Sequence, residues 1–387
     1  VEGSASSDAR SVFGEFGELG GLGSDGFDRT NRVQSTTYRI SPYLVQRFGG
    51  WASGRVGYAF SQGEQGGNAA FLPGQSQPFF TQQDLTSHEF YGSLSSGENW
   101  DRLGWDLRTS FRDYDGSGIY DGAHRNFHVL SARYQLTREF SLTGEAGWQD
   151  ERYAGVRPFS IEEPIWSVGF RVAPDPDSFL SVPYGKRDGE NSFAVDGGLL
   201  IGVRTRLVVN YSEEITTPFA RAGGLSASLR VDQFGNIVDA TTGLPISLTD
   251  PRLLANQSSV FRTKRGIAAA SQTWMRDTVT LALIREERTP VTSPVGTSGF
   301  AQDTSAVTFG WTRELEPGLS LNTVGRVGVT DTQGGGEENF YSLQAGLAQA
   351  FSPTLAGTLQ YQFTARDPET GGRTTQNMVL VTLRQLF

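Results

Sequence analysis

The amino-acid sequence predicts an all-β protein: a single antiparallel transmembrane β-barrel of about eighteen strands in a bacterial outer membrane. Three observations predict it. Apolar and polar residues alternate along most of the chain, short and long connections separate the alternating segments in turn, and the chain ends on an aromatic residue, Phe387. A barrel of about sixteen strands is the alternative.

The alternation is clear around residue 168, where Trp166, Val168 and Phe170 are separated by Ser167 and Gly169. The same pattern recurs in residues 105–112, 206–211 and 359–364. A single segment of this kind also fits a half-buried strand of a soluble sandwich. Repetition through nearly the whole chain favours a barrel whose apolar series faces lipid and whose polar series faces a wet lumen.

Composition agrees with strands as the membrane-crossing elements. The hydrophobic residues are 37% of the chain and the charged residues 19%, and no run approaches the length of about 20 apolar residues that a spanning helix needs. The mean hydropathy is −0.34, as low as that of a soluble protein. A transmembrane barrel tolerates this value because only every second strand residue contacts lipid.

The connections alternate in length, as in barrels with short periplasmic turns and long extracellular loops. Short turns are predicted at residues 49–50, 98–102, 138–140, 174–178, 276–277, 316–319 and 352–354. Long loops are predicted at residues 62–85, 113–124, 150–164, 186–190, 216–260, 288–302, 333–338 and 367–375.

Strands counted from Gln34 number about seventeen, whereas bacterial barrels normally have an even number. We therefore expect a first strand at residues 11–19, followed by a Gly-rich loop at 20–32. Residues 1–33 form this N-terminal segment, and residues 34–387 form the remainder of the barrel. Because an outer-membrane protein must be exported, we expect a removed signal upstream of Val1.

The longest predicted loop, residues 216–260, is expected to contain an extracellular hairpin at 228–244 with a Gly-Asn turn. Such a loop is either a protective lid or a plug that gates the lumen. Its apolar residues would let it pack on another part of the protein: Leu225, Leu229, Ile237, Leu244 and Ile246. We expect deletion of residues 223–254 to raise single-channel conductance in planar bilayers, and Arg108→Ala and Arg171→Ala mainly to change ion selectivity.

Enzyme chemistry has little support in the sequence. Cysteine is absent, and the three histidines are His88, His124 and His128. His128 and Ser131 are three residues apart, which places them on opposite faces of a strand. We therefore expect no catalytic residue, no metal site and no cofactor. The net charge of −9 disfavours nucleic-acid binding.

Adjacent glutamates at 162–163, 213–214, 286–287 and 337–338 are expected to be solvated charges near extracellular loops. The alternative is that these carboxylates bind calcium or the cations that bridge lipopolysaccharide molecules. Aromatic residues near strand ends are expected to form girdles at the membrane surfaces: Trp105, Trp148, Trp166, Tyr134, Tyr211 and Trp311.

Charged residues of both signs occupy the polar series and are expected to line the lumen: Arg39, Arg55, Asp106, Arg108, Arg112, Glu145, Arg171, Asp196, Arg204, Arg206 and Arg326. They either neutralise one another and brace the wall, or guide a hydroxyl-rich or acidic solute. Phe71, Phe79 and Phe80, in the loop at 62–85, would either stack on sugar rings or anchor that loop to the rim.

Four segments resemble one group of barrels: YRISPYLVQRF at 38–48, GWQDERY at 147–153, VGFRVAPDPDSFLSVPYGKRDGENSF at 168–193 and LVVNYSEEITT at 207–217. The chain resembles, over residues 34–387, the outer-membrane β-barrel family associated with PEP-CTERM and exosortase systems and encoded beside exopolysaccharide genes. Val379, Val381, Leu383 and the final Phe387 resemble the signal read by the barrel assembly machinery.

The resemblance implies a channel-like barrel that assists export of an extracellular polysaccharide. A general diffusion porin and a non-conducting structural or adhesive barrel are the alternatives, and an enzyme is a third. The partners implied are outer-membrane lipid, lipopolysaccharide, the assembly machinery, the polysaccharide and periplasmic polysaccharide-export proteins.

Overall fold

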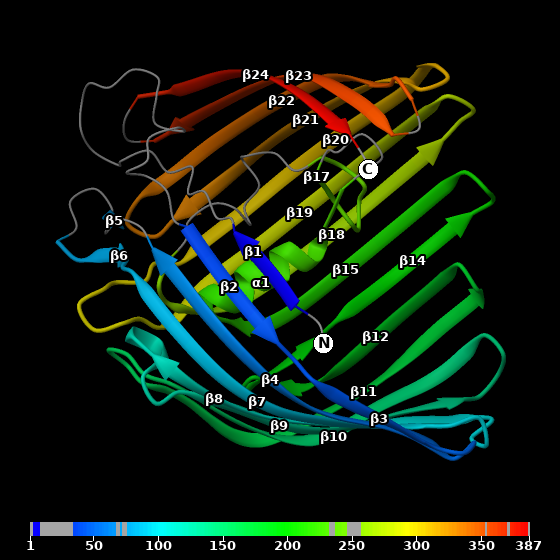
Figure 1. Ribbon diagram of the computed structural model, residues 1–387, viewed down its shortest axis with the longest axis vertical. Helices are drawn as coiled ribbons and strands as arrows, with labels where there is room; N and C mark the ends of the chain where they lie inside the picture. Colours follow the sequence, from blue (N-terminus) through cyan, green and yellow to red (C-terminus); the bar gives the residue numbers. More distant parts are fainter. Residues whose placement is uncertain are drawn as a thin grey trace.

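The computed structural model describes residues 3–7, 34–66, 70–71, 76–231, 237–245, 257–352, 354–369 and 372–385. Neighbouring strands pair antiparallel in one large sheet that curls around a lumen (Figure 1). Among the described residues, no helix combines the length and the apolar character needed to cross a membrane. The expected all-β barrel is therefore confirmed.

The wall begins with β1 (Gly3–Ser7), β2 (Gln34–Ile40), β3 (Tyr43–Phe48), β4 (Ala52–Gly66), β7 (Gln83–Ser96), β8 (Leu103–Gly116), β9 (His124–Gln135), β10 (Phe140–Tyr153) and β11 (Phe159–Asp175). It continues with β12 (Ser178–Arg187), β13 (Glu190–Phe193), β14 (Val195–Ile201), β15 (Thr205–Thr216), β18 (Val260–Thr273), β19 (Asp277–Thr292), β20 (Gln302–Glu316), β21 (Leu319–Thr332), β22 (Gly336–Ala350), β23 (Leu355–Pro368) and β24 (Thr374–Gln385).

Two wall strands are interrupted. β2 and β3 both pair with β4, and β13 and β14 both pair with β12. The first interruption falls at Ser41 and Pro42, where proline supplies no N–H for the ladder. Counting each interrupted pair as one strand, the 20 labelled strands make about eighteen wall strands, the number expected.

The first wall strand differs from the expectation. β1 pairs with β2 from Gly3 opposite Ile40 to Ser7 opposite Thr36, and so it precedes the strand expected at 11–19. The sequence of β1, GSASS, has no apolar series and gave no period-2 signal. The expected strand at 11–19, the loop at 20–32 and Phe387 lie outside the described residues.

The two faces of the wall have the predicted orientation. Leu107, Val168 and Phe170 are exposed on the outer face, whereas the intervening Arg108 and Arg171 face the lumen and contact lumen side chains. The first and last strands, β1 and β24, lie apart in Figure 1, and among the described residues no pairing joins them. An apolar outer surface around a polar lumen is the arrangement that a lipid bilayer requires.

Short turns gather at one end of the barrel, which we call the periplasmic end, and longer loops at the other, the extracellular end. Several strands extend beyond their predicted limits at the extracellular end. β10 and β11 leave only residues 154–158 between them instead of the predicted loop 150–164, and β12 and β13 leave a two-residue turn. Strand pairing can continue past the membrane without apolar residues, so hydrophobic alternation underestimates these strands.

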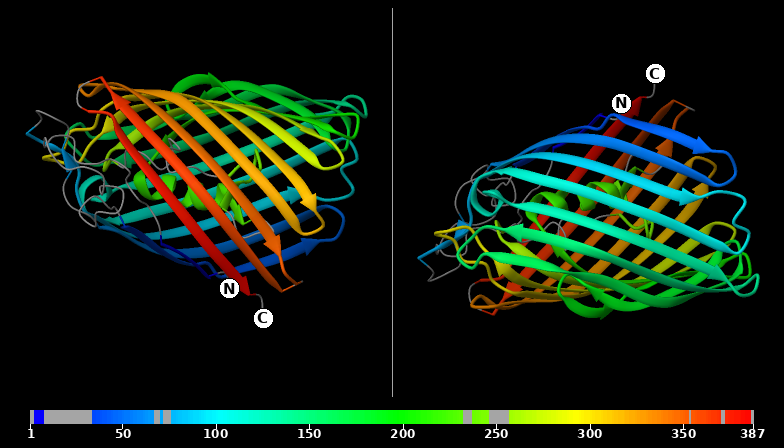
Figure 2. Two further views of the ribbon diagram at one scale, coloured as in Figure 1. Left: turned by 90° about the horizontal axis from the view of Figure 1, so that it is seen from above. Right: turned by 90° about the horizontal axis from the view of Figure 1, so that it is seen from below.

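The loop at 216–260 folds into the barrel. It contains α1 (Pro218–Ser228) and a hairpin of β16 (Leu229–Val231) and β17 (Ile237–Asp239). α1 lies inside the ring of strands in each view (Figures 1 and 2). The expected hairpin is present, but it lies within the barrel and not on its extracellular surface. Its Gly-Asn turn lies outside the described residues.

Candidate functional site

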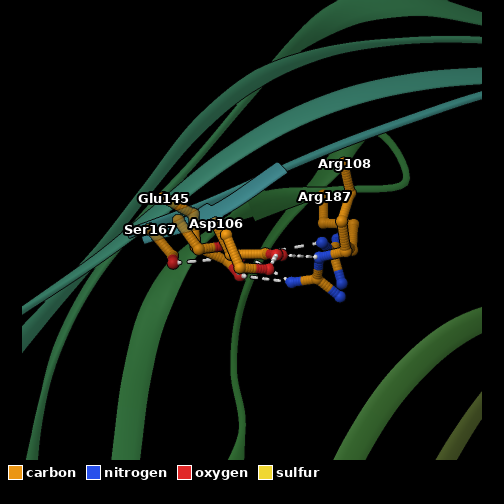
Figure 3. Close-up of polar contacts among 7 residues, drawn as sticks. Asp106, Arg108, Glu145, Ser167 and Arg187 are labelled. Atoms are coloured by element: carbon orange, nitrogen blue, oxygen red, sulfur yellow. Dashed lines mark hydrogen bonds and ion pairs between the residues drawn. The ribbon is translucent and has the colours of Figure 1, made fainter. Parts of the chain in front are cut away.

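The lumen-facing wall of β7 to β12 carries a polar network (Figure 3). The Arg108 Nε atom lies 2.8 Å from a carboxylate oxygen of Asp106, and its Nη2 atom lies 3.9 Å from Glu145. Arg187 reaches Glu145 at 3.6 Å, and Ser131 and Ser167 donate to the same carboxylate. Arg108 and Arg187 are about half exposed, so this network is accessible from the lumen.

A second network lies nearer the extracellular end. The Glu89 carboxylate accepts hydrogen bonds from Arg39 at 3.0 Å, from Arg112 at 2.5 Å and from the Ser110 hydroxyl at 2.8 Å. Glu89 is only 7% exposed, so its charge depends on these donors for the solvation it has lost. The network ties β2, β7 and β8 together and braces the wall.

Other predicted lumen residues are dispersed. The Arg55 guanidinium lies 3.7 Å from the centre of the Tyr43 ring, and the Arg171 guanidinium lies 4.1 Å from that of Phe179. The buried Arg326 donates to the Thr308 hydroxyl.

The register of β14 with β15 places Asp196 opposite Asn210, and Arg206 opposite Leu200. Arg204 was expected in the wall but lies in the exposed turn between these strands. The period-2 pattern of residues 204–211 continues into the turn and does not mark where β15 begins.

The helix inside the barrel is attached to the wall through a buried carboxylate. Glu286 of β19 accepts a hydrogen bond of 2.9 Å from Arg265 of β18, and Arg221 of α1 lies 3.6 Å away. The sequence interpretation of Glu286 as a solvated loop charge is wrong, since the residue is 4% exposed. Its neighbour Glu287 points to the outer face and pairs with Arg285, as adjacent strand residues must.

Two glycines of the wall receive side chains of the inserted loop. A Cβ placed on Gly63 of β4 would lie 2.6 Å from the ring of Phe219 in α1. One placed on Gly310 of β20 would lie 2.2 Å from a methyl group of Leu244. Leu244 also packs with Ala269, Ala282 and Val324 in a buried cluster. Phe219 and Leu244 therefore fill the spaces beside two wall glycines, Gly63 and Gly310, which we call notches. We call the inserted segment that carries these side chains, from α1 to Leu244, the plug.

An apolar cap lies above the helix at the extracellular end. It is a buried cluster of Leu85, Ile119, Tyr120, Ala123, Tyr153, Ile215, Phe219 and Val260. Ile119 and Tyr120 come from η2 (Gly118–Tyr120), a short helix in the β8–β9 loop. The Tyr120 ring lies 5.5 Å from that of Phe219, and its burial raises the pKa of the phenol. Plug and cap are thus one continuous packed unit.

Extracellular loops are joined to one another across the lumen. The Ser258 hydroxyl donates to the Thr81 carbonyl and accepts from the Thr81 N–H, and the Gln83 amide donates to the Ser258 carbonyl. Phe79 and Phe80, in β6 (Pro78–Phe80), are buried, and Phe79 packs against Phe300. These two rings anchor the loop and are not available for sugar stacking. The Phe71 side chain, in β5 (Ala70–Phe71), lies outside the described residues.

The outer face holds the predicted aromatic residues. Tyr134, Trp148 and Trp166 are between 40% and 45% exposed, and each has the strand parity opposite to a lumen-facing residue: Arg133, Glu145 or Ser167. Trp105 packs against Trp100, Tyr211 stacks on Phe193, and Trp311 donates to Asp277. The histidines are strand residues: His88 bonds to Tyr58, His128 to Thr109, and His124 to Asp150. In the described part of the chain, His, Asp and Glu form no metal-binding group.

Sequence reasoning missed η2 and Phe219. Ile119 and Tyr120 of η2, and Phe219 of α1, are apolar residues in polar, Gly-rich segments without periodicity. Their role is therefore visible only from their long-range contacts. The only local signal was weak: the isolated pairs Ile119-Tyr120 and Pro218-Phe219 place large apolar side chains in polar loops, which also occurs at solvated positions.

Adding one methyl group at Gly63 of β4 tests whether the Phe219 ring helps to hold the plug against the wall. Gly63→Ala is expected to displace the Phe219 ring, and single-channel recordings in planar bilayers should then show several-fold longer open times. Gly66→Ala on the same strand is the matched control, because a Cβ there meets no atom within 4 Å. An equal response to both changes would mean that the ring does not help to hold the plug.

No protein-family model matches the sequence, and no curated protein is similar to it. Among solved structures, a mutant of the ferric enterobactin receptor PfeA from Pseudomonas aeruginosa is 10% identical, with a TM-score of 0.52, and the match covers 91% of this chain and 62% of that one. The siderophore receptor PirA from the same organism is 11% identical, with a TM-score of 0.50, and the match covers 92% and 65%.

This chain spans less than two thirds of the length of the matched receptor chains. At such identities the likeness shows the fold alone. Together with the apolar outer face, it identifies the chain as an integral β-barrel of the bacterial outer membrane.

Proposed function

We propose that this barrel is a gated conduit that assists export of an extracellular polysaccharide across the outer membrane. One observation carries the proposal: the lumen is polar below the plug, whereas plug and apolar cap obstruct its extracellular part. A solute arriving from the periplasm would meet hydrogen-bonding groups first and the closure last. This order of contacts suits a substrate that leaves the cell.

The lumen chemistry suits a sugar polymer. Asp106 and Glu145 offer acceptors, Arg108 and Arg187 offer donors, and all four are partly exposed. A sugar hydroxyl donates one hydrogen bond and can accept others, so a surface that offers both acceptors and donors can bind it without a covalent step. The sequence resemblance to barrels of exopolysaccharide gene clusters supports the same substrate class. Transport through such a lumen is passive, so energy must come from periplasmic or inner-membrane partners.

The alternatives predict different lumens. A general diffusion porin should be open in its resting state, and the anchored plug favours a gated channel over that reading. A structural or adhesive barrel should stay closed even when the plug is loosened. The distinguishing property is therefore the passage of oligosaccharides once the plug is displaced.

The test compares liposomes that contain the unmodified barrel with liposomes that contain the variant Phe219→Ala/Leu244→Ala. Both kinds of liposome are loaded with fluorescent oligosaccharides of graded length. We expect liposomes with the variant to release the oligosaccharides several-fold faster than liposomes with the unmodified barrel. A variant on the outer face, Leu107→Ala, serves as the control and should behave as the unmodified protein. Release of salt without release of any oligosaccharide would contradict the proposal.

A further inference from the structure

The periplasmic half of the lumen has a lopsided distribution of charge. Register places five arginines toward the lumen near the short turns on the wall from β4 to β15, which we call the arginine wall: Arg55, Arg108, Arg133, Arg171 and Arg206. The wall from β18 to β23 presents hydroxyl and amide groups at the same level, among them Ser271, Thr280, Asn322 and Gln360. The two sides of the lumen therefore differ in chemistry.

Carboxylates neutralise only part of the arginine wall. Asp106 and Glu145 pair with Arg108, and Glu145 also pairs with Arg187. Asp196 faces the lumen between β12 and β15, and Glu314 follows at the rim. Among the described contacts, no carboxylate lies within ion-pair distance of Arg55, Arg133, Arg171 or Arg206. A chain with a net charge of −9 thus presents excess positive charge in this part of its lumen.

Two of these arginines are held on aromatic rings. Arg55 lies over Tyr43, and Arg171 lies over Phe179. A guanidinium stacked on a ring keeps its N–H groups in the plane parallel to that ring, where they can donate to a carboxylate in pairs. Ring contact also holds the side chain in place, which lowers the entropy lost on binding. These are features of a site for anions and not only of a solvated wall.

We propose that the arginine wall is a binding surface for an acidic polysaccharide, whose carboxylates it contacts while the hydroxyl and amide wall faces the uncharged part of the chain. The inference rests on the proposed export function and adds the charge of its substrate. The ligand enters from the periplasmic end, below the plug, so the closed barrel already binds it. Sulfate esters offer similar anionic oxygens, and the experiment separates the two sources.

Binding is measured by titration calorimetry with the full-length barrel in detergent and three probes of equal length: oligogalacturonate, sulfated dextran and neutral dextran. We expect oligogalacturonate to bind at least tenfold more tightly than neutral dextran, with an affinity that falls as salt increases. If the sulfated probe binds more tightly than oligogalacturonate, the group that the arginine wall recognises is a sulfate ester, and the proposed carboxylate is wrong. Equal binding of all three, or none, would overturn the inference.

Variants locate the site. Arg55→Gln/Arg171→Gln and Arg133→Gln/Arg206→Gln are each expected to weaken oligogalacturonate binding about tenfold, in line with about 1.4 kcal/mol for a tenfold change. Arg285→Gln/Arg313→Gln removes the same charge from the outer face, and it should leave binding unchanged. An equal loss in the outer-face variant would show a nonspecific charge effect and overturn the proposal.

The calorimetric result is independent of conduction. A barrel that binds the acidic probe but never releases oligosaccharides from liposomes contradicts the export function. A barrel that releases neutral and acidic oligosaccharides alike, without preferential binding, contradicts the acidic substrate alone.

Discussion

Deleting residues 223–254 in a background of Phe219→Ala is expected to convert a nearly closed barrel into one whose conductance in planar bilayers is at least an order of magnitude higher. The deletion removes the hairpin and Leu244, which fills the Gly310 notch, and the substitution removes the ring from the Gly63 notch. About eighteen strands enclose more space than their own side chains fill, so an unobstructed lumen should be wet.

The controls separate opening from damage. The deletion alone keeps Phe219 and the Arg221–Glu286 pair, so a smaller increase is expected. Both variants should keep the electrophoretic shift of a folded barrel upon heating. If the folded double variant conducts no better than the full-length protein, the lumen is not a conduit, and the structural alternative gains support.

The second large effect concerns the stability of the wall. Glu89→Ala is expected to destabilise the barrel by about 3 kcal/mol, because it leaves the guanidinium groups of Arg39 and Arg112 without their shared carboxylate. Removing one partner of a buried ion pair usually costs about 3–5 kcal/mol. The lower end of this range applies because Arg39 is 41% exposed and keeps some hydration. The measurement is reversible unfolding in urea with the protein inserted in liposomes.

Glu287→Ala gives the matched comparison. Its partner Arg285 is 60% exposed and keeps Asp303 as a second partner, so a loss of at most about 1 kcal/mol is expected. Glu89→Gln should lie between the two, because an amide oxygen still accepts from Ser110. Similar values for Glu89→Ala and Glu287→Ala would mean that burial of the Glu89 network contributes nothing to stability.

The wall was predictable from the sequence because its determinants are local. A period of two places Val168 on the lipid face and Arg171 on the lumen face without knowledge of any neighbour. The extracellular ends of the strands were less predictable. There both faces are polar, so the strands carry no signal that separates them from loops.

The plug was only partly predictable. The apolar character of Leu244 suggested a residue that packs on another part of the protein. The space that receives it lies beside Gly310, which is 66 positions away in the sequence and has no local signature. Glu286 looked like a solvated charge because its partner Arg221 comes from the inserted helix. Contacts between a loop and a distant wall depend on the three-dimensional path of the chain, which alternation does not encode.

The inserted segment leaves the wall at the end of β15 and returns at the start of β18, and these two strands pair directly along their length. The hydrogen-bond ladder is thus continuous beneath the insertion. Displacing the plug would break contacts inside the lumen but no rung of the ladder. The permeability of the membrane and the mechanical integrity of the cylinder are consequently separate properties: amide protons of β15 and β18 should exchange equally slowly in the closed and the open protein.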